Sequence, residues 1–438
     1  MPGRSAPRSL GVTELIAMGV GGMIGGGIFS ILGLAVETAG HAAPLAFVVG
    51  SLVALTAGYS YVGLALRYRS DGASFTYLER AFPSQLWVAG IGGWTVVVGY
   101  IGTLALYAFT FGAYGAHLLG LEGVPLARGA LAVVVLLGLA AVNLRGAAAM
   151  GRAEDIAVYV KITLLAILAG VGMTTVEPER IRPLFDRGVP SVFLAGALVF
   201  VAYEGFQLIT NAVLESRAPE RDIPRGIYGS IAITSLIYVA IAFVAVGSLD
   251  PQEIGDAGEY ALAVVARPAM GRLGVVLVDI AALLATASAI NATVFGASRL
   301  ASEMATEHLA PTVFSFRNRH RVPWIGVSAI TALGIALTLI GGLEFIAAFS
   351  RMTFLLVSIA VSVANLRLRH ETGSRLLPIV AGLVLMCVTV GLLVVELLRN
   401  DRAALIACVA IYGATAASHL AFSRMRQRSR PQPAHDCE

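Results

Sequence analysis

Residues 19–29 read Gly-Val-Gly-Gly-Met-Ile-Gly-Gly-Gly-Ile-Phe and lie inside an uncharged stretch from Leu15 to Val36. These 22 uncharged residues are enough to cross a bilayer as a helix. Six of the eleven quoted residues are glycine, and each glycine costs a helix about 1 kcal/mol relative to alanine. Two interpretations follow: a helix packed closely against its neighbours through small residues, or a helix broken at membrane depth.

A second candidate break favours the broken helix. The stretch Tyr203-Glu204-Gly205-Phe206 places an acid and a glycine between aromatic residues, inside another long apolar segment. Unwound backbone at membrane depth persists only where it is buried or lines a cavity, and there its free N–H and C=O groups can hold a polar solute. The pair of breaks therefore points to a solute site within the membrane.

The chain has 438 residues, of which 57% are hydrophobic and 13% are charged, which is too apolar for a soluble protein. No soluble segment longer than about 25 residues is expected, so any chemistry lies in the bilayer or at its faces. The apolar stretches predict twelve membrane spans, at 12–36, 42–66, 86–118, 128–143, 154–174, 190–214, 226–248, 271–300, 323–342, 344–366, 376–396 and 403–423.

The two candidate breaks fall in spans one and six, so each opens a set of five spans. Because five is odd, the two sets insert with opposite orientation, which is the inverted repeat of many secondary transporters. The expected divisions are a first repeat at 1–175, a second repeat at 188–367, two further spans at 375–424 and a cytoplasmic tail at 425–438.

The basic residues predict the orientation. Loops on the side of the termini carry 21 Lys and Arg residues against 8 in the opposite loops, and Lys161 and Arg351 lie inside spans. Both termini are therefore expected in the cytoplasm, with the protein in the plasma membrane. The excess of basic over acidic residues is explained by these cytoplasmic loops, so no nucleic-acid partner is needed to account for it. The scattered Cys387, Cys408 and Cys437 suggest neither a disulfide framework nor a metal site, and no cofactor is expected.

Four ionisable residues lie within predicted spans. Lys161 is the only lysine of the chain, and a buried lysine, unlike arginine, can lose its proton. It either snorkels to the membrane surface or has a function in the interior. Glu204 either titrates or binds substrate, or serves as a structural hydrogen-bonding group. Asp279 is expected to be structural and to pair with Arg351.

Four stretches resemble a known family: Gly22 to Phe29, Ser70 to Phe82, Phe200 to Ile227, and Asn291 to Pro311. The chain looks like an amino acid permease of the amino acid–polyamine–organocation superfamily. The resemblance implies an all-α integral membrane protein with twelve transmembrane helices, in a leucine-transporter-like five-plus-five inverted repeat whose helices one and six are broken. Three positions depart from the family: Gly26 where many relatives have serine, Gln207 where many have an acid, and Ala218 in place of asparagine before Pro219. The lost serine hydroxyl leaves the substrate's identity open.

The resemblance also implies the substrate site. The substrate's carboxylate is expected on the N–H groups of Gly25, Gly26 and Gly27, at the positive end of the second half of helix one. Its ammonium is expected at carbonyls freed by the breaks, at Met23 and around Val201 and Glu204. Tyr203, Asn291 and Thr293 are expected to contribute to side-chain specificity. Whether Tyr203 or Phe206 serves as a gate or as core packing stays open.

Lys161 resembles the fifth-helix lysine of some proton-coupled members, which stands where sodium-coupled relatives bind their ion. Protonated, it is expected to hold span five to carbonyls of the broken first helix and to hydroxyls of Thr286 and Ser288. The function predicted is uptake of amino acids by proton symport. The alternative is an amino acid exchanger with Lys161 as a fixed charge, and a channel or sensor is remote. An enzyme is not expected. The expected partners are an amino acid, protons and the lipid bilayer, with the protein as a monomer or homodimer.

Overall fold

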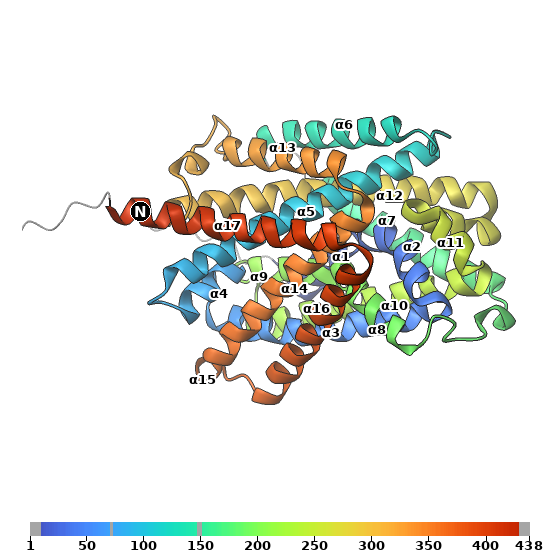
Figure 1. Ribbon diagram of the computed structural model, residues 1–438, viewed down its shortest axis with the longest axis horizontal. Coiled ribbons are helices and arrows are strands. Elements are labelled where there is room, and N and C mark those ends of the chain that lie inside the picture. The colour runs from blue at the N-terminus through green and yellow to red at the C-terminus, as the bar shows by residue number, and fades with distance from the viewer. Residues whose placement is uncertain (1–9, 71–72, 147–150, 429–438) are drawn as a thin grey trace, which may run out of the picture.

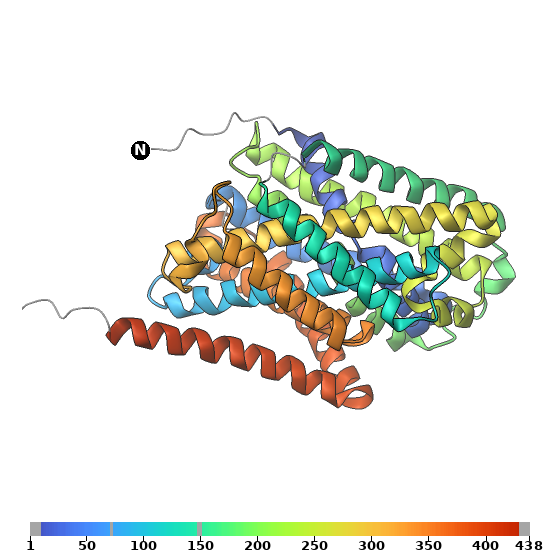
Figure 2. The same ribbon diagram turned by 90° about the horizontal axis from the view of Figure 1, so that it is seen from above.

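The computed structural model describes residues 10–70, 73–146 and 151–428. The secondary structure of these residues is helical apart from one isolated bridge between Leu10 and Ser216. Most of the long helices run along the long axis of the molecule (Figures 1 and 2). The fold of the described chain is therefore all-α, as the sequence predicts.

The helices of the first part of the chain end before the loop at residues 182–188. They are α1 (Val12–Met23), α2 (Gly27–Ala39), η1 (Gly40–Ala42), α3 (Ala43–Arg67), α4 (Ala73–Ala81), α5 (Leu86–Leu118), α6 (Pro125–Leu144), α7 (Gly151–Gly172), η3 (Met173–Thr175) and η4 (Pro178–Ile181).

The second part begins with another interrupted helix. Its elements are α8 (Val189–Val199), η5 (Phe200–Gln207), α9 (Leu208–Asn211), α10 (Pro219–Ser248), α11 (Pro251–Ala257), η6 (Gly258–Tyr260), α12 (Ala261–Thr306), η7 (Thr312–Ser315), α13 (Trp324–Ile340), α14 (Leu343–Arg367), α15 (Arg369–Thr372), α16 (Leu376–Asn400) and α17 (Arg402–Arg428).

Ten segments of the described chain are long and apolar enough to cross a membrane. One of them, Gly27–Arg67, contains both α2 and α3, while α1 and α13 are apolar but shorter than a spanning helix needs by itself. Every span expected from the sequence falls on helix, and α5 has the expected bounds of 86–118. The count of twelve crossings stays a prediction, because it requires α1 and α2 to form one interrupted crossing.

Local sequence explains where several helices begin and bend. Proline lies in the first turn of α3, α6, α8 and α10, where its missing N–H leaves no hydrogen bond unmade. The long α12 bends at Gly271, whose φ of 59° is a left-handed conformation that favours glycine. The straight apolar part of α12 therefore starts at this bend, where the sequence places the start of span eight.

Two groups of helices surround the broken segments. One side is formed by α5 and α12, which pack against each other, and the other by α3 and α10. The short α1 contacts α10, α7 and η5, so its end lies deep in the bundle. By contrast, α6 and α13 lie side by side at one edge, and α17 lies along the outside (Figures 1 and 2). Within the described chain, α1, α2 and η5 are therefore the interrupted segments that lie in the interior, where a site can be built.

Candidate substrate site

The first break is short and its glycines are required by close packing. Helix α1 ends at Met23 and α2 begins at Gly27. A Cβ atom at Gly26 would overlap the ring of Tyr107 on α5, and one at Gly25 would lie 2.8 Å from Cβ of Ala289 on α12. The glycines thus let the two scaffold helices approach the backbone of the break.

The start of α2 offers backbone donors. Its first intrahelical hydrogen bond runs from Ser30 N–H to Gly26 O, at 2.9 Å. The N–H groups just before Ser30 therefore precede the ladder and carry the positive end of the helix dipole. The Ser30 hydroxyl also donates to Gly26 O (2.6 Å) and lies 2.7 Å from the Thr110 hydroxyl on α5, which fixes this first turn against α5.

The carbonyls at the end of α1 are held by side chains from two other helices. Lys161 of α7 is 1% exposed, and its Nζ donates to Gly21 O at 2.7 Å. Tyr238 of α10 is fully buried, and its hydroxyl lies 2.7 Å from Met23 O and 3.2 Å from Ala202 O. Lys161 therefore does not snorkel to the membrane surface, and one tyrosine hydroxyl joins the first break to the second.

The second interruption is tightened and not unwound, which differs from the expectation of an open break. Residues Phe200–Gln207 form a 3-10 helix, a long run for this conformation, between α8 and α9. A Cβ atom at Gly205 would overlap backbone atoms of Gly22 and Met23. The extra tightness follows from this contact, because the backbone of η5 must pass directly against the end of α1.

The amino acid permease family matches residues 10–415, which is most of the chain. The chain belongs to this family. It is thus an integral multi-pass membrane transporter of the amino acid–polyamine–organocation superfamily and not an enzyme.

Three relatives illustrate the range of similarity to this permease. The uncharacterized protein MJ0609 of Methanocaldococcus jannaschii is 31% identical over 376 residues, 84% of each chain. The inner membrane transport protein YbaT of Escherichia coli is 31% identical over 398 residues, 89% of this chain and 90% of that protein. The serine/threonine exchanger SteT of Bacillus subtilis is 24% identical over 387 residues, 85% and 86% of the two chains.

Glu204 is an acid within the second interruption of the permease, η5. It is 9% exposed, and its Oε1 atom is buried with no hydrogen-bond partner among the described residues. Gln207, one 3-10 turn further along η5, likewise has a buried side-chain nitrogen without a partner in the described chain. Side chains three residues apart on a 3-10 helix lie above one another. One face of η5 thus carries an acceptor and a donor that are both available.

The aromatic residues of η5 are engaged in packing. The Tyr203 hydroxyl donates to Phe47 O on α3 at 3.0 Å, and its ring centroid lies 5.3 Å from that of Tyr238. The Phe206 ring packs edge-on against Tyr61, at 5.5 Å. Both side chains are fully buried. Their contacts are those of core packing, and the proposed gate would require these contacts to break.

The site residues that the sequence predicts on α12 lie on different faces of that helix. Ala289 faces the first break, and with about 100° per residue Thr293 and Thr286 lie within about 60° of it. Asn291 lies about 200° away, where its Oδ1 accepts a hydrogen bond of 2.6 Å from Asn143 on α6. The Thr286 hydroxyl donates to its own helix at Ala282 O, and Ser288 is half-buried. Helix geometry thus puts Thr293 and Thr286 on the side of α12 that carries Ala289, whereas Asn291 contacts α6.

The expected pair of Asp279 with Arg351 is wrong. Nδ1 of His117 on α5 lies 3.0 Å from both carboxylate oxygens of Asp279. Arg351 on α14 lies 3.7 Å from Oε2 of Glu396 on α16. Asp279 and Arg351 therefore pair with residues of other helices, and the order of the spans in the sequence does not show which helices are adjacent.

Sequence reasoning missed Tyr238 and Tyr107, two tyrosines that contact the first break. Each lies in the middle of a predicted span, in an otherwise apolar stretch. A buried tyrosine hydroxyl usually finds a hydrogen-bond partner, so a mid-span tyrosine is a signal for an exposed carbonyl nearby. That signal was available, although it does not say which helix supplies the carbonyl.

Proposed function

We propose that this permease is a secondary active transporter that takes up amino acids by alternating access in the cytoplasmic membrane. Its twelve crossings form two inverted sets of five plus two further helices, and both termini lie in the cytoplasm. The observation that carries the proposal is the direct contact of the two interruptions, at Gly205 against Gly22 and Met23. Opposed helix ends meeting in the interior are suited to a zwitterion.

The substrate's carboxylate is placed at the N–H groups of Gly25, Gly26 and Gly27, at the start of α2. The ammonium is placed beside η5, near the Val201 carbonyl and the Glu204 carboxyl. The Met23 carbonyl, part of the expected ammonium site, already accepts from Tyr238. Because a carbonyl has two lone pairs, Met23 can still accept a second donor, and Tyr238 then lies beside the substrate.

Coupling to protons is assigned to Lys161. The short hydrogen bond of its ammonium to Gly21 O ties α7 to the end of α1, and the neutral amine is a weaker donor to the same carbonyl. Losing the proton would loosen this tie and allow α1 to move. The energy is sufficient, since moving one charge through the membrane potential yields about 2.3 kcal/mol per 100 mV, more than tenfold in accumulation.

Uptake of a labelled amino acid into proteoliposomes tests the coupling. An acid exterior should drive concentrative uptake by the unmodified protein, whereas Lys161→Met, always neutral, and Lys161→Arg, always charged, should lose that drive. Exchange of internal for external substrate at equal pH serves as the control for folding. Concentrative uptake by Lys161→Arg that still follows the pH gradient would exclude Lys161 as the proton carrier.

A second candidate function is obligatory exchange, because SteT, a serine/threonine exchanger by name, is a relative over most of the chain. In that case Lys161 is a permanently charged strut. Transport would then need substrate inside the vesicles, ignore a pH gradient and survive Lys161→Arg. A thermal-shift screen of the twenty amino acids at two pH values would identify the substrate in either case. Single-channel currents would instead indicate a channel.

A further inference from the structure

A cluster of charged and aromatic side chains lies far from the substrate site, at the end of the bundle where α5 passes into α6. Residues 250–260, comprising α11 and η6, cover this end, and we call them the lid. Figures 1 and 2 show α11 at this end and the last turns of α17 at the opposite end. The lid packs against α2, where the Gly258 carbonyl lies against Gly33, and against α5.

The lid is fastened to the scaffold helices by two contacts. The ring of Tyr260 stacks on the imidazole of His117, with centroids 4.4 Å apart and an angle of 15° between the planes. Glu259 pairs with Arg128 of α6 at 3.0 Å, and the Arg128 guanidinium lies over the Phe109 ring at 4.2 Å. The His117 ring is in turn held by Asp279, so Tyr260 rests directly on a histidine–aspartate pair.

We propose that His117 and Asp279 form a proton-binding site, separate from Lys161, whose protonation closes the lid. With Tyr260 of the lid stacked on the ring, the side chains of His117 and Asp279 are only 11% and 2% exposed. Closing over a neutral imidazole would bury an uncompensated carboxylate, whereas closing over an imidazolium buries a neutral pair. The imidazolium also attracts the face of Tyr260. Lid closure is therefore linked to proton uptake, and low pH favours the closed lid.

Other charged groups face the ring from each neighbouring element. The charged or titratable residues around the His117 ring are Asp279, Arg267 and Arg272 on α12, Tyr260 and Glu259 on η6, Arg128 on α6, and Glu122 in the loop after α5. Arg128 and Glu259 neutralise each other, and Asp279 is the acid in direct contact with the ring. Arg267 disfavours an imidazolium and Glu122 favours one, so their effects oppose each other, and the direct contact of the ring with Asp279 sets the sign of the linkage.

Protons have a route to the pair even when the lid is closed. A surface pocket of about 400 Å³ is lined by His117 and Asp279 together with Leu118, Gly120, Arg267, Arg272, Val275 and Val276. Since Nδ1 of the ring faces Asp279, the other ring nitrogen is the one left to exchange its proton with water in this pocket. The pair can thus sense the pH at this end of the molecule.

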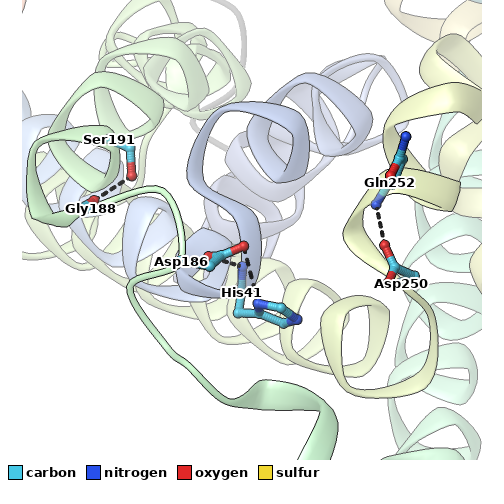
Figure 3. Close-up of polar contacts among 6 residues, drawn as sticks. All are labelled: His41, Asp186, Gly188, Ser191, Asp250 and Gln252. Atoms are coloured by element: carbon cyan, nitrogen blue, oxygen red, sulfur yellow. Dashed lines mark hydrogen bonds and ion pairs between the residues drawn. The ribbon is translucent and has the colours of Figure 1, made fainter.

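The same end of the permease offers a matched control. His41, after α2, also pairs with an aspartate: its Nδ1 lies 3.2 Å from Asp186 Oδ2, and its backbone N–H donates to Asp186 Oδ1 at 3.1 Å (Figure 3). This pair holds the loop before α8 to the turn after α2. The first turn of the lid is capped separately, by Asp250 accepting from Gln252 N–H at 2.8 Å (Figure 3). His41 is thus a second histidine paired with an aspartate, and in the described part of the chain no tyrosine ring stacks on it.

Thiol accessibility in lipid nanodiscs, where both faces share one pH, tests the proposal without substrate or gradient. Ile254→Cys on α11, fully buried in the closed lid, reports opening, and the exposed Glu253→Cys corrects for the pH dependence of the thiol reaction. Both are made in a background with Cys387, Cys408 and Cys437 replaced by serine. The corrected labelling rate of Ile254→Cys should fall about tenfold from pH 8.0 to 5.5. This is the change expected if the proton affinity of the pair differs by about one pKa unit between the closed and the open lid.

Three variants decide the cause of that fall. His117→Gln should reduce the fall in labelling rate from about tenfold to less than about twofold, while His41→Gln should leave the tenfold fall unchanged. Asp279→Asn should reverse its sign, because closing then buries a lone imidazolium at low pH and a neutral pair at high pH. A fall that persists in both His117→Gln and Asp279→Asn would overturn the proposal, as would its loss in His41→Gln. Lys161→Met should keep the response, so a failure of proton coupling is distinguished from a failure of the lid site.

Discussion

Replacing Tyr238 by phenylalanine removes one oxygen atom from the contact between the two interruptions. That oxygen lies 2.7 Å from Met23 O and 3.2 Å from Ala202 O in a fully buried position. Leaving a buried acceptor unpaired costs about 1–3 kcal/mol, and 2 kcal/mol corresponds to about 30-fold in an equilibrium constant. If the joined breaks form the transporting arrangement, Tyr238→Phe should lower kcat/KM for uptake by about tenfold or more.

Tyr203→Phe is the matched control. It removes a hydroxyl from another fully buried tyrosine, which lies in η5 against the Tyr238 ring but donates outward to Phe47 O on α3, at 3.0 Å, and not to a carbonyl of either break. Both variants should lower the free energy of unfolding by a similar 1–3 kcal/mol or so, seen as equal losses of melting temperature. Only Tyr238→Phe should impair uptake beyond the effect of instability. Equal loss of uptake in the two variants would refute a special role for the joined carbonyls.

Three further changes test other parts of the site. Gly26→Ala would drive a methyl group into the Tyr107 ring, so amino acid binding by thermal shift should be lost; binding that survives would show that the ring yields freely. Glu204→Gln keeps the shape but removes the carboxylate placed beside the ammonium, and should weaken binding of a zwitterion about tenfold at pH 8 by thermal shift; unchanged binding would exclude Glu204 from the site. Arg351→Met leaves Glu396 buried without its partner and should cost about 3–5 kcal/mol of stability, and adding Glu396→Gln should recover most of it; no recovery would mean that the pair is not the cause.

Hydropathy predicted the positions of the helices well because lipid requires long uncharged runs whatever their partners are. The span expected at 86–118 is α5, and the span expected at 376–396 lies within α16. The glycine run likewise predicted the interruption between α1 and α2, since so many glycines leave a helix weak at that point. These features depend on local sequence alone.

Contacts between helices were harder to predict, because hydropathy does not give the rotation of a helix about its axis. Asn291 and Thr293 are both polar and only two residues apart, yet helix geometry turns them about 200° from each other, and Asn291 bonds to Asn143 on α6. The same reason explains the wrong pairing of Asp279 with Arg351. A charge within a span has to find a partner, and the sequence shows the need without the direction.

The form of the second interruption illustrates a further limit. A single glycine at 205 among aromatic residues predicted an open break. The structure instead has a 3-10 helix there, in direct backbone contact with the end of α1. Such a segment keeps hydrogen bonds three residues apart, so fewer of its carbonyls are freed than in an unwound segment. The donors and acceptors left for a solute are then the N–H groups that start α2 and the side chains of η5. We therefore expect Glu204 and Gln207 to contribute more to recognition than the carbonyls that the sequence suggested, since both carry unpaired polar atoms in the described structure.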